Sequence, residues 1–210
     1  MPRPPRFSED QILDAGLARV AEGGPGALTV TAVARRIGAP SGSIYHRFGS
    51  RDLLAGHLWL RTVEAFQAAW LDALDGSDEP LERARRGAAQ VLTWSAANPD
   101  GARLLVRHRR EDLLADGGPA DLRDADRRQR ERAAGALHDL ARRFGGDGRQ
   151  HLRRVSFACV EVPTTEVRRG LALGTLPDAT SHALVDETVV ALLAPLVDRR
   201  PPDGAPPPAR

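Results

Sequence analysis

A stretch of cationic and hydroxyl-bearing side chains without a carboxylate lies between Glu22 and Asp52. Its basic side chains are Arg35, Arg36, His46, Arg47 and Arg51. It also contains the small, hydroxyl-bearing tripeptide Ser41-Gly42-Ser43. Arginine and hydroxyl groups hold the phosphates of nucleic acids, and small residues allow a helix end to approach base edges closely. The stretch therefore predicts a surface that binds nucleic acid.

Two short helices joined by a tight turn are predicted to position these side chains. Thr29 is a good N-cap for the first helix, and Gly38 ends it because glycine readily adopts the left-handed conformation. Pro40 favours the start of the second helix. The buried face of the pair would consist of Val30, Val33, Ala34, Ile37, Ile44 and Phe48. Small residues at the crossing allow the close, steep packing of a DNA-binding helix-turn-helix.

Helix-turn-helix patterns alone match many unrelated sequences, and a helical hairpin with an incidentally basic face is the alternative. The segment, however, resembles the DNA-binding domain of the tetracycline-repressor (TetR) family of bacterial transcription regulators. The matching residues are Leu28-Thr29, Val33-Ala34, Ile37-Gly38, Gly42-Ser43-Ile44-Tyr45, Phe48, Arg51 and Leu53-Leu54. This resemblance is strong over residues 8–56 and weaker beyond them, where the order and length of helices match.

The resemblance implies roles for the residues of the DNA-binding face. Bases would be faced by Thr31, Ser41, Gly42 and Ser43. Phosphates would be contacted by Thr29 and Tyr45, with His46 and Arg47 able to reach flanking phosphates. A lysine at the position of Arg51 holds the DNA backbone in the family, and arginine replaces this point donor by a planar fork. Pro40 stands where the family often has serine, so the second helix loses a hydroxyl cap.

Composition and charge place few further limits on the 210-residue chain. Its formal net charge of +2 is too small for a generally basic coat, so charge matters by position. The single cysteine, Cys159, excludes an internal disulfide and is typical of a reducing compartment. No apolar run is expected to span a bilayer, and the first residues lack the apolar core of a signal peptide. We expect a soluble, cytoplasmic protein.

Helical periodicity without strand-like alternation predicts an all-α fold of about nine helices. Residues 1–56 would comprise an arm up to residue 7 and a three-helix DNA-binding domain whose first helix is capped by Ser8. A fourth helix from Ser50 to about Leu74 would connect it to a helical ligand-binding and dimerisation domain spanning residues 57–198. Further helices are expected near 81–97, 102–106, 121–144, 150–171 and 179–197. The Pro-rich segment 199–210 would be a disordered tail.

The last predicted helix, residues 179–197, is apolar around most of its circumference in its second half. A helix of this kind must be covered on all sides. We expect a partner chain to cover it, so that the last two helices, about 150–171 and 179–197, form a two-fold homodimer interface. A central position within the core of one subunit is the alternative.

Enzymatic chemistry finds no support in the sequence. The six histidines form no i, i+4 pair, and none lies near Cys159 in the sequence. We therefore expect no metal site. A Gly-rich phosphate loop and a nucleophile elbow are also absent. The interpretation is a protein that is not an enzyme and needs no cofactor.

Family members usually hold a small, often apolar effector in the C-terminal helices, which changes the separation of the two DNA-binding heads. Candidate effector-binding residues here are Trp94, Leu105, Phe157, Cys159 and Pro163. Pro163 should kink its helix and free a carbonyl near the bundle centre. For each candidate, simple core packing is an equally good interpretation.

These observations predict a homodimeric transcriptional regulator that binds a palindromic operator in double-stranded DNA. A repressor released by a small, partly apolar effector is the expected form. Two alternatives remain: an architectural DNA-binding protein that needs no ligand, and a ligand or protein-interaction module whose helix-turn-helix is idle. The sequence does not identify the effector, the operator, or the direction of regulation.

Overall fold

The computed structural model describes residues 7–75, 79–114, 118–146 and 148–197, which form ten α-helices and no β-strand. The helices are α1 (Glu9–Gly23), α2 (Val30–Ile37), α3 (Ser41–Phe48), α4 (Arg51–Asp75), α5 (Pro80–Ala97), α6 (Pro99–Arg107), α7 (Ala120–Arg143), α8 (Arg149–Ser156), α9 (Val162–Leu173) and α10 (Ala179–Val197). Two 3₁₀ turns, η1 (Pro25–Ala27) and η2 (Arg110–Asp112), lie between them. A π-helical turn, Phe157–Glu161, makes α8 and α9 one continuous helix.

The predicted all-α fold and its helix order are confirmed over these residues. Because α8 and α9 form one continuous helix, the described residues contain nine separate helices, as predicted. The predicted tail 199–210, and the arm except for Phe7, lie outside the described residues. Short-range signals explain why the predicted helix ends agree with the structure. The Ser8 hydroxyl accepts a hydrogen bond from the Gln11 backbone amide, and the Gln11 side-chain oxygen accepts one from the Ser8 backbone amide.

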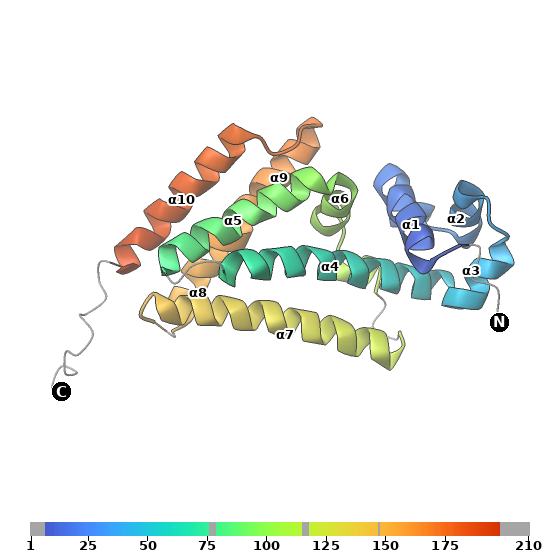
Figure 1. Ribbon diagram of the computed structural model, residues 1–210, viewed down its shortest axis with the longest axis horizontal. Helices are drawn as coiled ribbons and strands as arrows, with labels where there is room; N and C mark the ends of the chain where they lie inside the picture. The colour runs from blue at the N-terminus through green and yellow to red at the C-terminus, as the bar shows by residue number, and fades with distance from the viewer. Residues whose placement is uncertain (1–6, 76–78, 115–117, 147, 198–210) are drawn as a thin grey trace.

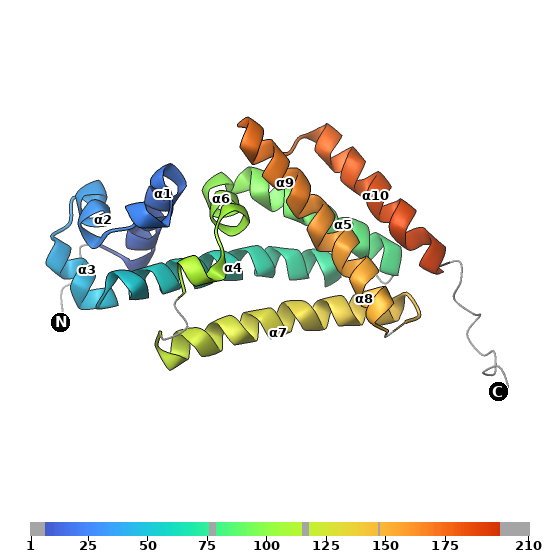
Figure 2. The ribbon, with the colours of Figure 1, turned by 180° about the vertical axis from the view of Figure 1, so that it is seen from behind.

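The long helix α4 joins two parts of the molecule (Figures 1 and 2). Its N-terminal end lies among α1, α2 and α3, which together form the head. Its C-terminal half packs among the other long helices, which form the body. Helix α7 runs beside α4 in the same direction, so both helices begin near the head and end at the far side of the body.

The apolar core of the head is completed by residues from the body. It contains the expected side chains of α1 to α4, including Ile12, Val33 and Leu54. The same cluster includes Leu104 from α6, Leu113 and Leu114 after η2, and Leu122 from α7. A second core fills the body between α4, α5, α7, α8–α9 and α10. The domain boundary at residue 56 therefore stays a prediction, and the head core crosses it.

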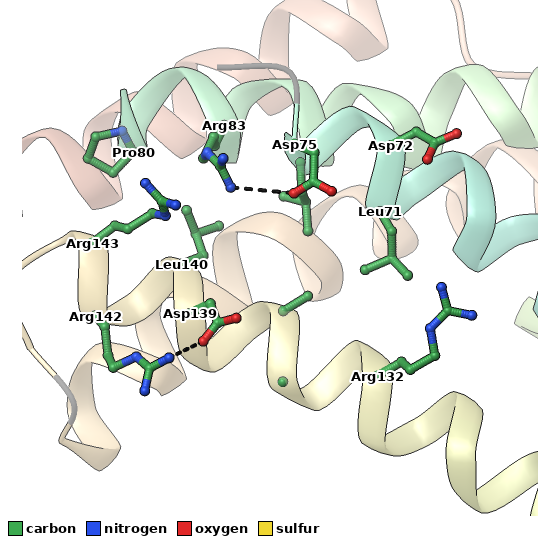
Figure 3. Close-up of a pocket in the computed structure, with 13 residues that line it drawn as sticks. Leu71, Asp72, Asp75, Pro80, Arg83, Arg132, Asp139, Leu140, Arg142 and Arg143 are labelled. Carbon is green, nitrogen blue, oxygen red and sulfur yellow. Dashed lines mark hydrogen bonds and ion pairs between the residues drawn. The ribbon is translucent and has the colours of Figure 1, made fainter. Parts of the chain in front are cut away.

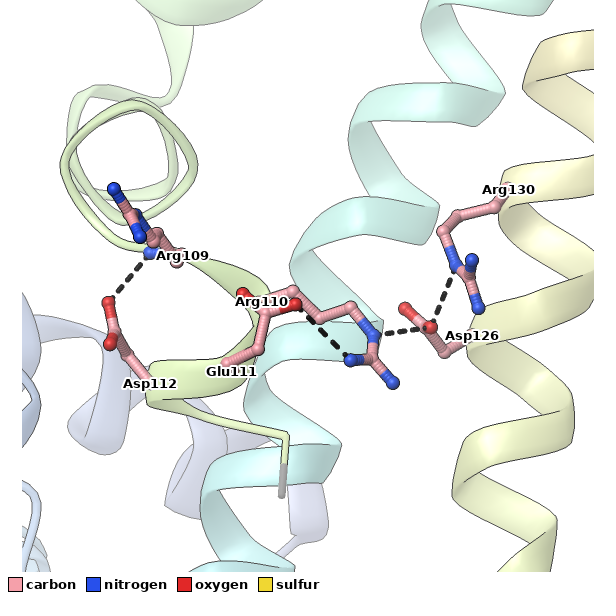
Figure 4. A network of polar contacts seen from close by, with 6 residues as sticks. All are labelled: Arg109, Arg110, Glu111, Asp112, Asp126 and Arg130. Carbon is pink, nitrogen blue, oxygen red and sulfur yellow. Dashed lines mark hydrogen bonds and ion pairs between the residues drawn. The ribbon is translucent and has the colours of Figure 1, made fainter. Parts of the chain in front are cut away.

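A buried carboxylate holds the segment that reaches into the head core (Figure 4). Asp126 on α7 is 2% exposed. Its Oδ2 accepts hydrogen bonds from Arg110 Nε at 2.7 Å and from Arg130 Nε at 3.0 Å. Arg110 belongs to η2, so Asp126 ties the connection between α6 and α7 to the first turns of α7. This contact fixes where Leu113 and Leu114 lie.

A π-helical turn precedes Pro163 in its helix, and the expected kink and free carbonyl stay predictions. Proline has no N–H to donate to the carbonyl four residues earlier. The helix accommodates it with the π turn directly before α9, in which the Val162 N–H donates to the Phe157 carbonyl five residues back. The widened turn shifts the helical register, and residues on either side of it consequently face different directions.

Replacing Asp126 by alanine is expected to lower the free energy of unfolding by about 2 kcal/mol, since partly buried Arg110 loses its carboxylate partner. Urea denaturation of the purified protein measures this change. Asp124→Ala is the matched control, because Asp124 pairs with the more exposed Arg127 at 2.9 Å. Its loss should cost less than about 0.5 kcal/mol. Equal losses in the two variants would contradict the assigned role of Asp126.

Candidate DNA-binding face and body surfaces

The turn between α2 and α3 has the geometry that the sequence predicts. Thr29 caps α2 by accepting a hydrogen bond from the Ala32 amide at 3.1 Å. Gly38 ends α2 in the left-handed conformation with a φ of 66°. In α3, Ile44 and Phe48 are buried, and the Phe48 ring meets His57 of α4 edge-on at 5.5 Å between ring centroids. One face of α3 is therefore fixed to the head, and the other faces solvent.

The solvent-facing side of the pair contains the predicted DNA-contacting residues. Exposed residues there are Thr29, Thr31, Gly42, Ser43, Tyr45 and His46, and Ser41 and Arg47 are half-buried. Tyr45 keeps 51% of its surface exposed despite its aromatic ring. The Ser43 hydroxyl donates to the Pro40 carbonyl at 2.7 Å and keeps its oxygen lone pairs as acceptors. The α3 surface thus presents small and hydroxyl-bearing groups together, as base readout requires.

The positive charge of this surface is smaller than the sequence indicates. Arg36 forms an ion pair with Glu22 of α1 at 2.7 Å, and Arg19 binds the same carboxylate. The hydrogen bond from Arg36 holds the pKa of the Glu22 carboxyl below its usual value. Arg35 and Arg47 make no hydrogen bond or ion pair with the described residues. These two arginines are thus the cations best placed to meet DNA phosphate.

Arg51 is engaged inside the head. Its Nε donates to the Leu28 carbonyl at 3.1 Å and its Nη2 to the Pro25 carbonyl at 2.7 Å. Its Nη1 pairs with Asp52 at 3.1 Å. These contacts connect η1 and the start of α2 to the first turn of α4, which a lysine with a single nitrogen could not do in the same way. Phosphate contact by Arg51 stays a prediction, and it would use the remaining N–H groups.

Comparisons with known proteins agree with this geometry. Residues 12–58 match the family described as bacterial regulatory proteins, tetR family. Residues 12–58 thus form a DNA-binding domain of the TetR family. Comparison with curated proteins gives no match.

Solved structures share the TetR-family fold over almost the whole chain. A TetR-like regulator from Rhodococcus sp. RHA1 has a TM-score of 0.69 at 19% identity and covers 91% of this chain and 99% of its own. The regulator FadR from Bacillus subtilis, in complex with stearoyl-CoA, has a TM-score of 0.65 at 16% identity, covering 89% and 98%. A regulator from Marinobacter aquaeolei VT8 has a TM-score of 0.68 at 17% identity, covering 88% and 94%. At these identities the likeness establishes the fold alone.

The predicted effector-binding residues do not line one common cavity. Trp94 is buried and packs edge-on against Phe66 at 5.3 Å between ring centroids, and Leu105 is half-buried beside both cores. Cys159 is fully buried, and burial raises the pKa of its thiol to about 12. Pro163 is buried too, whereas Phe157 is 45% exposed. Trp94 lines a cleft of about 380 Å³ toward α1, and Phe157 lines a separate groove of about 330 Å³ beside α10.

A third cavity, larger than these two, contains none of these residues. It is an open groove of about 940 Å³ between the C-terminal ends of α4 and α7 and the start of α5 (Figure 3). Its lining residues are Leu71, Asp72, Leu74, Asp75, Pro80, Arg83, Arg132, Gly135, Ala136, Asp139, Leu140, Arg142 and Arg143. Sequence patterns do not reveal this groove, because charged residues near helix ends look like ordinary solvated faces. The described residues contain no group of three or more potential metal ligands among His, Cys, Asp and Glu.

Several large apolar side chains in and between α8, α9 and α10 are exposed. These side chains are Phe157, Leu173, Leu176, Leu184 and Val197. Only 28% of the most apolar window of α10 is buried within the chain. By length and composition α10 could cross a membrane, so the prediction that no segment reaches that limit was wrong. This helix meets the criterion because only two of its residues, the adjacent Asp186 and Glu187, are acidic or basic apart from histidine.

Arg51→Ala is expected to lower the free energy of unfolding by about 1 kcal/mol, because two carbonyls lose their charged donor. Arg47→Ala is the matched control, and it should leave stability unchanged while reducing the slope of log affinity for DNA against log salt by about one. Denaturation and salt-dependent DNA binding distinguish the two roles. If Arg51→Ala kept full stability but lost the salt slope, phosphate contact would be its main function.

Proposed function

We propose that this chain is a homodimeric, effector-responsive transcriptional regulator that binds a palindromic operator, with repression as its expected mode. The observation that carries the proposal is the solvent-facing side of α3, where Gly42, Ser43 and Tyr45 are exposed on a helix held by the head core. No carboxylate of α2 or α3 opposes it, since none occurs between Glu22 and Asp52. A surface of this composition suits a major groove better than a protein partner or a substrate.

The proposed contacts divide by chemistry. Thr31, Ser41, Gly42 and Ser43 are assigned to base edges, because they are small and lie on α2 and the first turn of α3. Phosphate contacts are assigned to Thr29, Tyr45, His46, Arg47 and Arg51. The Thr29 oxygen accepts the capping hydrogen bond from Ala32, so its O–H remains free to donate to a phosphate oxygen.

Dimerisation is proposed through α8–α9 and α10. The exposed side chains Phe157 and Leu184 line one groove on this face, and Val185 lies at its base. Large apolar side chains that are exposed to water next to each other favour self-association. A two-fold interface would place the α3 helices of the two heads to meet successive major grooves, which are about 34 Å apart. Only the buried quarter of α10 supports the alternative of a core helix in a single chain.

Effector binding in the body is proposed on two grounds. The structural neighbour FadR is described in complex with stearoyl-CoA, so a protein of this fold binds a ligand. In this chain, α4 and α7 both extend from the body into the head core, through Leu54 and Leu122 respectively. A ligand that binds more tightly to one arrangement of these helices would change the operator affinity by differential binding.

Gly42→Leu is expected to reduce operator affinity by about tenfold or more without loss of folding stability. A Cβ atom at Gly42 would have no neighbour within 4 Å, so the side chain meets only what docks on α3. The operator is first obtained by selection from genomic fragments, and affinity is measured by fluorescence anisotropy. Gly148→Leu, at an equally open position before α8 in the body, is the control and should bind DNA normally. Full affinity of Gly42→Leu would contradict the assignment of α3 to the major groove.

The same assay separates the other functions. An architectural protein would bind random DNA and the selected operator about equally at matched salt. A module with an idle helix-turn-helix would bind neither, even at low salt.

Leu184→Asp is expected to convert the dimer to a folded monomer, because a charge at the interface centre must be desolvated in both copies. Leu184 is 50% exposed in the single chain, so its replacement should leave folding intact. Sedimentation velocity measures the oligomeric state. Ala134→Asp, an exposed position on α7, is the control and should remain dimeric. A Leu184→Asp dimer of wild-type stability would show that the interface lies elsewhere.

A further inference from the structure

The groove between α4, α5 and α7 combines an apolar floor with a charged rim (Figure 3). Leu74 and Leu140 are 3% exposed each and form its base, with Leu71 and Ala136 half-buried beside them. Around this floor stand four arginines and three aspartates. A volume of about 940 Å³ is of the size that small-molecule sites usually have. The groove therefore suits a molecule with both an apolar and a polar part.

The charges of the rim are unequal. Arg83 pairs with Asp75 at 3.6 Å, and Arg142 pairs with Asp139. Arg132 and Arg143 make no hydrogen bond or ion pair with the described residues. Asp72 is the one remaining carboxylate of the lining, so four cations face three anions and the net charge is +1. This excess favours an anion, and guanidinium groups hold phosphate and carboxylate oxygens well through paired N–H donors.

Two buried polar atoms without partners lie one helical turn from residues of the groove. The Gln67 side-chain oxygen on α4 and the Gln129 side-chain oxygen on α7 are both buried without a hydrogen bond among the described residues. Gln67 precedes Leu71 by one turn and Gln129 precedes Arg132 by one turn, but neither residue lines the groove. Such atoms are uncommon in folded proteins because an unmet hydrogen bond is costly.

We propose that this groove is the effector site and that the effector is an anionic amphiphile. Its phosphate or carboxylate head would be held by one of the two unpaired arginines, Arg143 at one end of the groove or Arg132 at the other, and its apolar part would cover Leu71, Leu74 and Leu140. Its role as an effector site rests on the function proposed above. The site itself rests on the groove and its charge.

The position of the groove gives the ligand a means of acting on the head. Its walls are the C-terminal ends of α4 and α7, and the N-terminal ends of the same two helices lie in the head core. Leu122 and Gly56 touch at that end, so the two helices behave as a pair that is joined at the head and separated at the groove. A molecule between the separated ends changes the angle of the pair, and the head moves with it.

Calorimetry on the DNA-free, full-length protein tests the site with defined probes below their aggregation limits. Decyl phosphate and decanoate represent the two head groups, and decanol and decyltrimethylammonium are the neutral and cationic counterparts. We expect binding of one or both anions and weak binding of the other two. Inorganic phosphate should bind at least about tenfold more weakly than decyl phosphate, because it leaves the apolar floor uncovered. Equal affinity for inorganic phosphate would overturn the amphiphile class.

Two kinds of variant locate the binding. The double variant Arg132→Ala and Arg143→Ala should weaken anion binding by about tenfold or more. Arg128→Ala, also exposed on α7 but outside the groove, should change it by less than about twofold. Gly135→Leu should block the groove, because a Cβ there has no neighbour within 4 Å and the new side chain occupies ligand space. No anion binding by the wild-type protein, or binding unaffected by these variants, would overturn the site.

Release of the selected operator by the bound probe is measured separately. Release that is lost in the Arg132→Ala and Arg143→Ala variant supports the effector role. Groove-dependent binding without release would overturn the effector role and leave the anion site standing. Absence of any DNA binding would overturn the proposed regulator instead, because the calorimetric result does not depend on DNA.

Discussion

The close packing of Leu114 and Leu122 against Gly56 is the contact on which the arrangement of head and body depends. A Cβ atom at Gly56 would lie 3.0 Å from Leu122 Cδ1 and 3.2 Å from Leu114 Cδ1, so no larger residue fits without displacement. The contact brings α4, α7 and the connection after η2 together at one place. Because interiors pack densely, a shift of α7 relative to α4 must be accommodated there by movement of the head. Asp126 prevents the alternative response, in which the η2 connection alone would yield.

Local signals made most of the helices predictable. They did not indicate that residues of the body complete the head core. Ser8, Thr29 and Gly38 act on backbone groups within a few residues, so their effect can be derived from the sequence. Leu122 looks like any residue of an amphipathic stripe, and no local property shows that its partners are Gly56 and the head rather than the body. Periodicity tells which face of a helix is buried but not what buries it.

The candidate sites show the same limit for charges. Because no carboxylate lies within the stretch, the sequence predicts that Arg36 and Arg51 add positive charge to the DNA-binding face. In the structure, Glu22 reaches Arg36 from a preceding helix, and Arg51 is used by the carbonyls of Leu28 and Pro25. Phe157, the first residue of the π turn, is 45% exposed and lies in a groove beside α10 instead of in the body core. Net charge and helical spacing could not anticipate either outcome.

Either a partner chain or a lipid bilayer could cover the exposed apolar side of α10. The polar contacts of α10 with α5 favour a partner chain. Asp186 accepts two hydrogen bonds from Arg85 of α5, at 2.6 Å and 3.0 Å, which fix α10 on the body. Insertion into a bilayer would break this pair and bring Asp186 and Glu187 near the membrane centre, at a cost of about 2.5–3.5 kcal/mol for a charged residue there. A second copy can cover Leu184 and Phe157 while both carboxylates keep their partners or water. In Figure 1, α10 and α7 lie on opposite sides of α4 and α5, so the proposed dimer leaves the arginine-lined groove open. The proposed ligand and the partner chain therefore need not compete, and both can act on α4 at once.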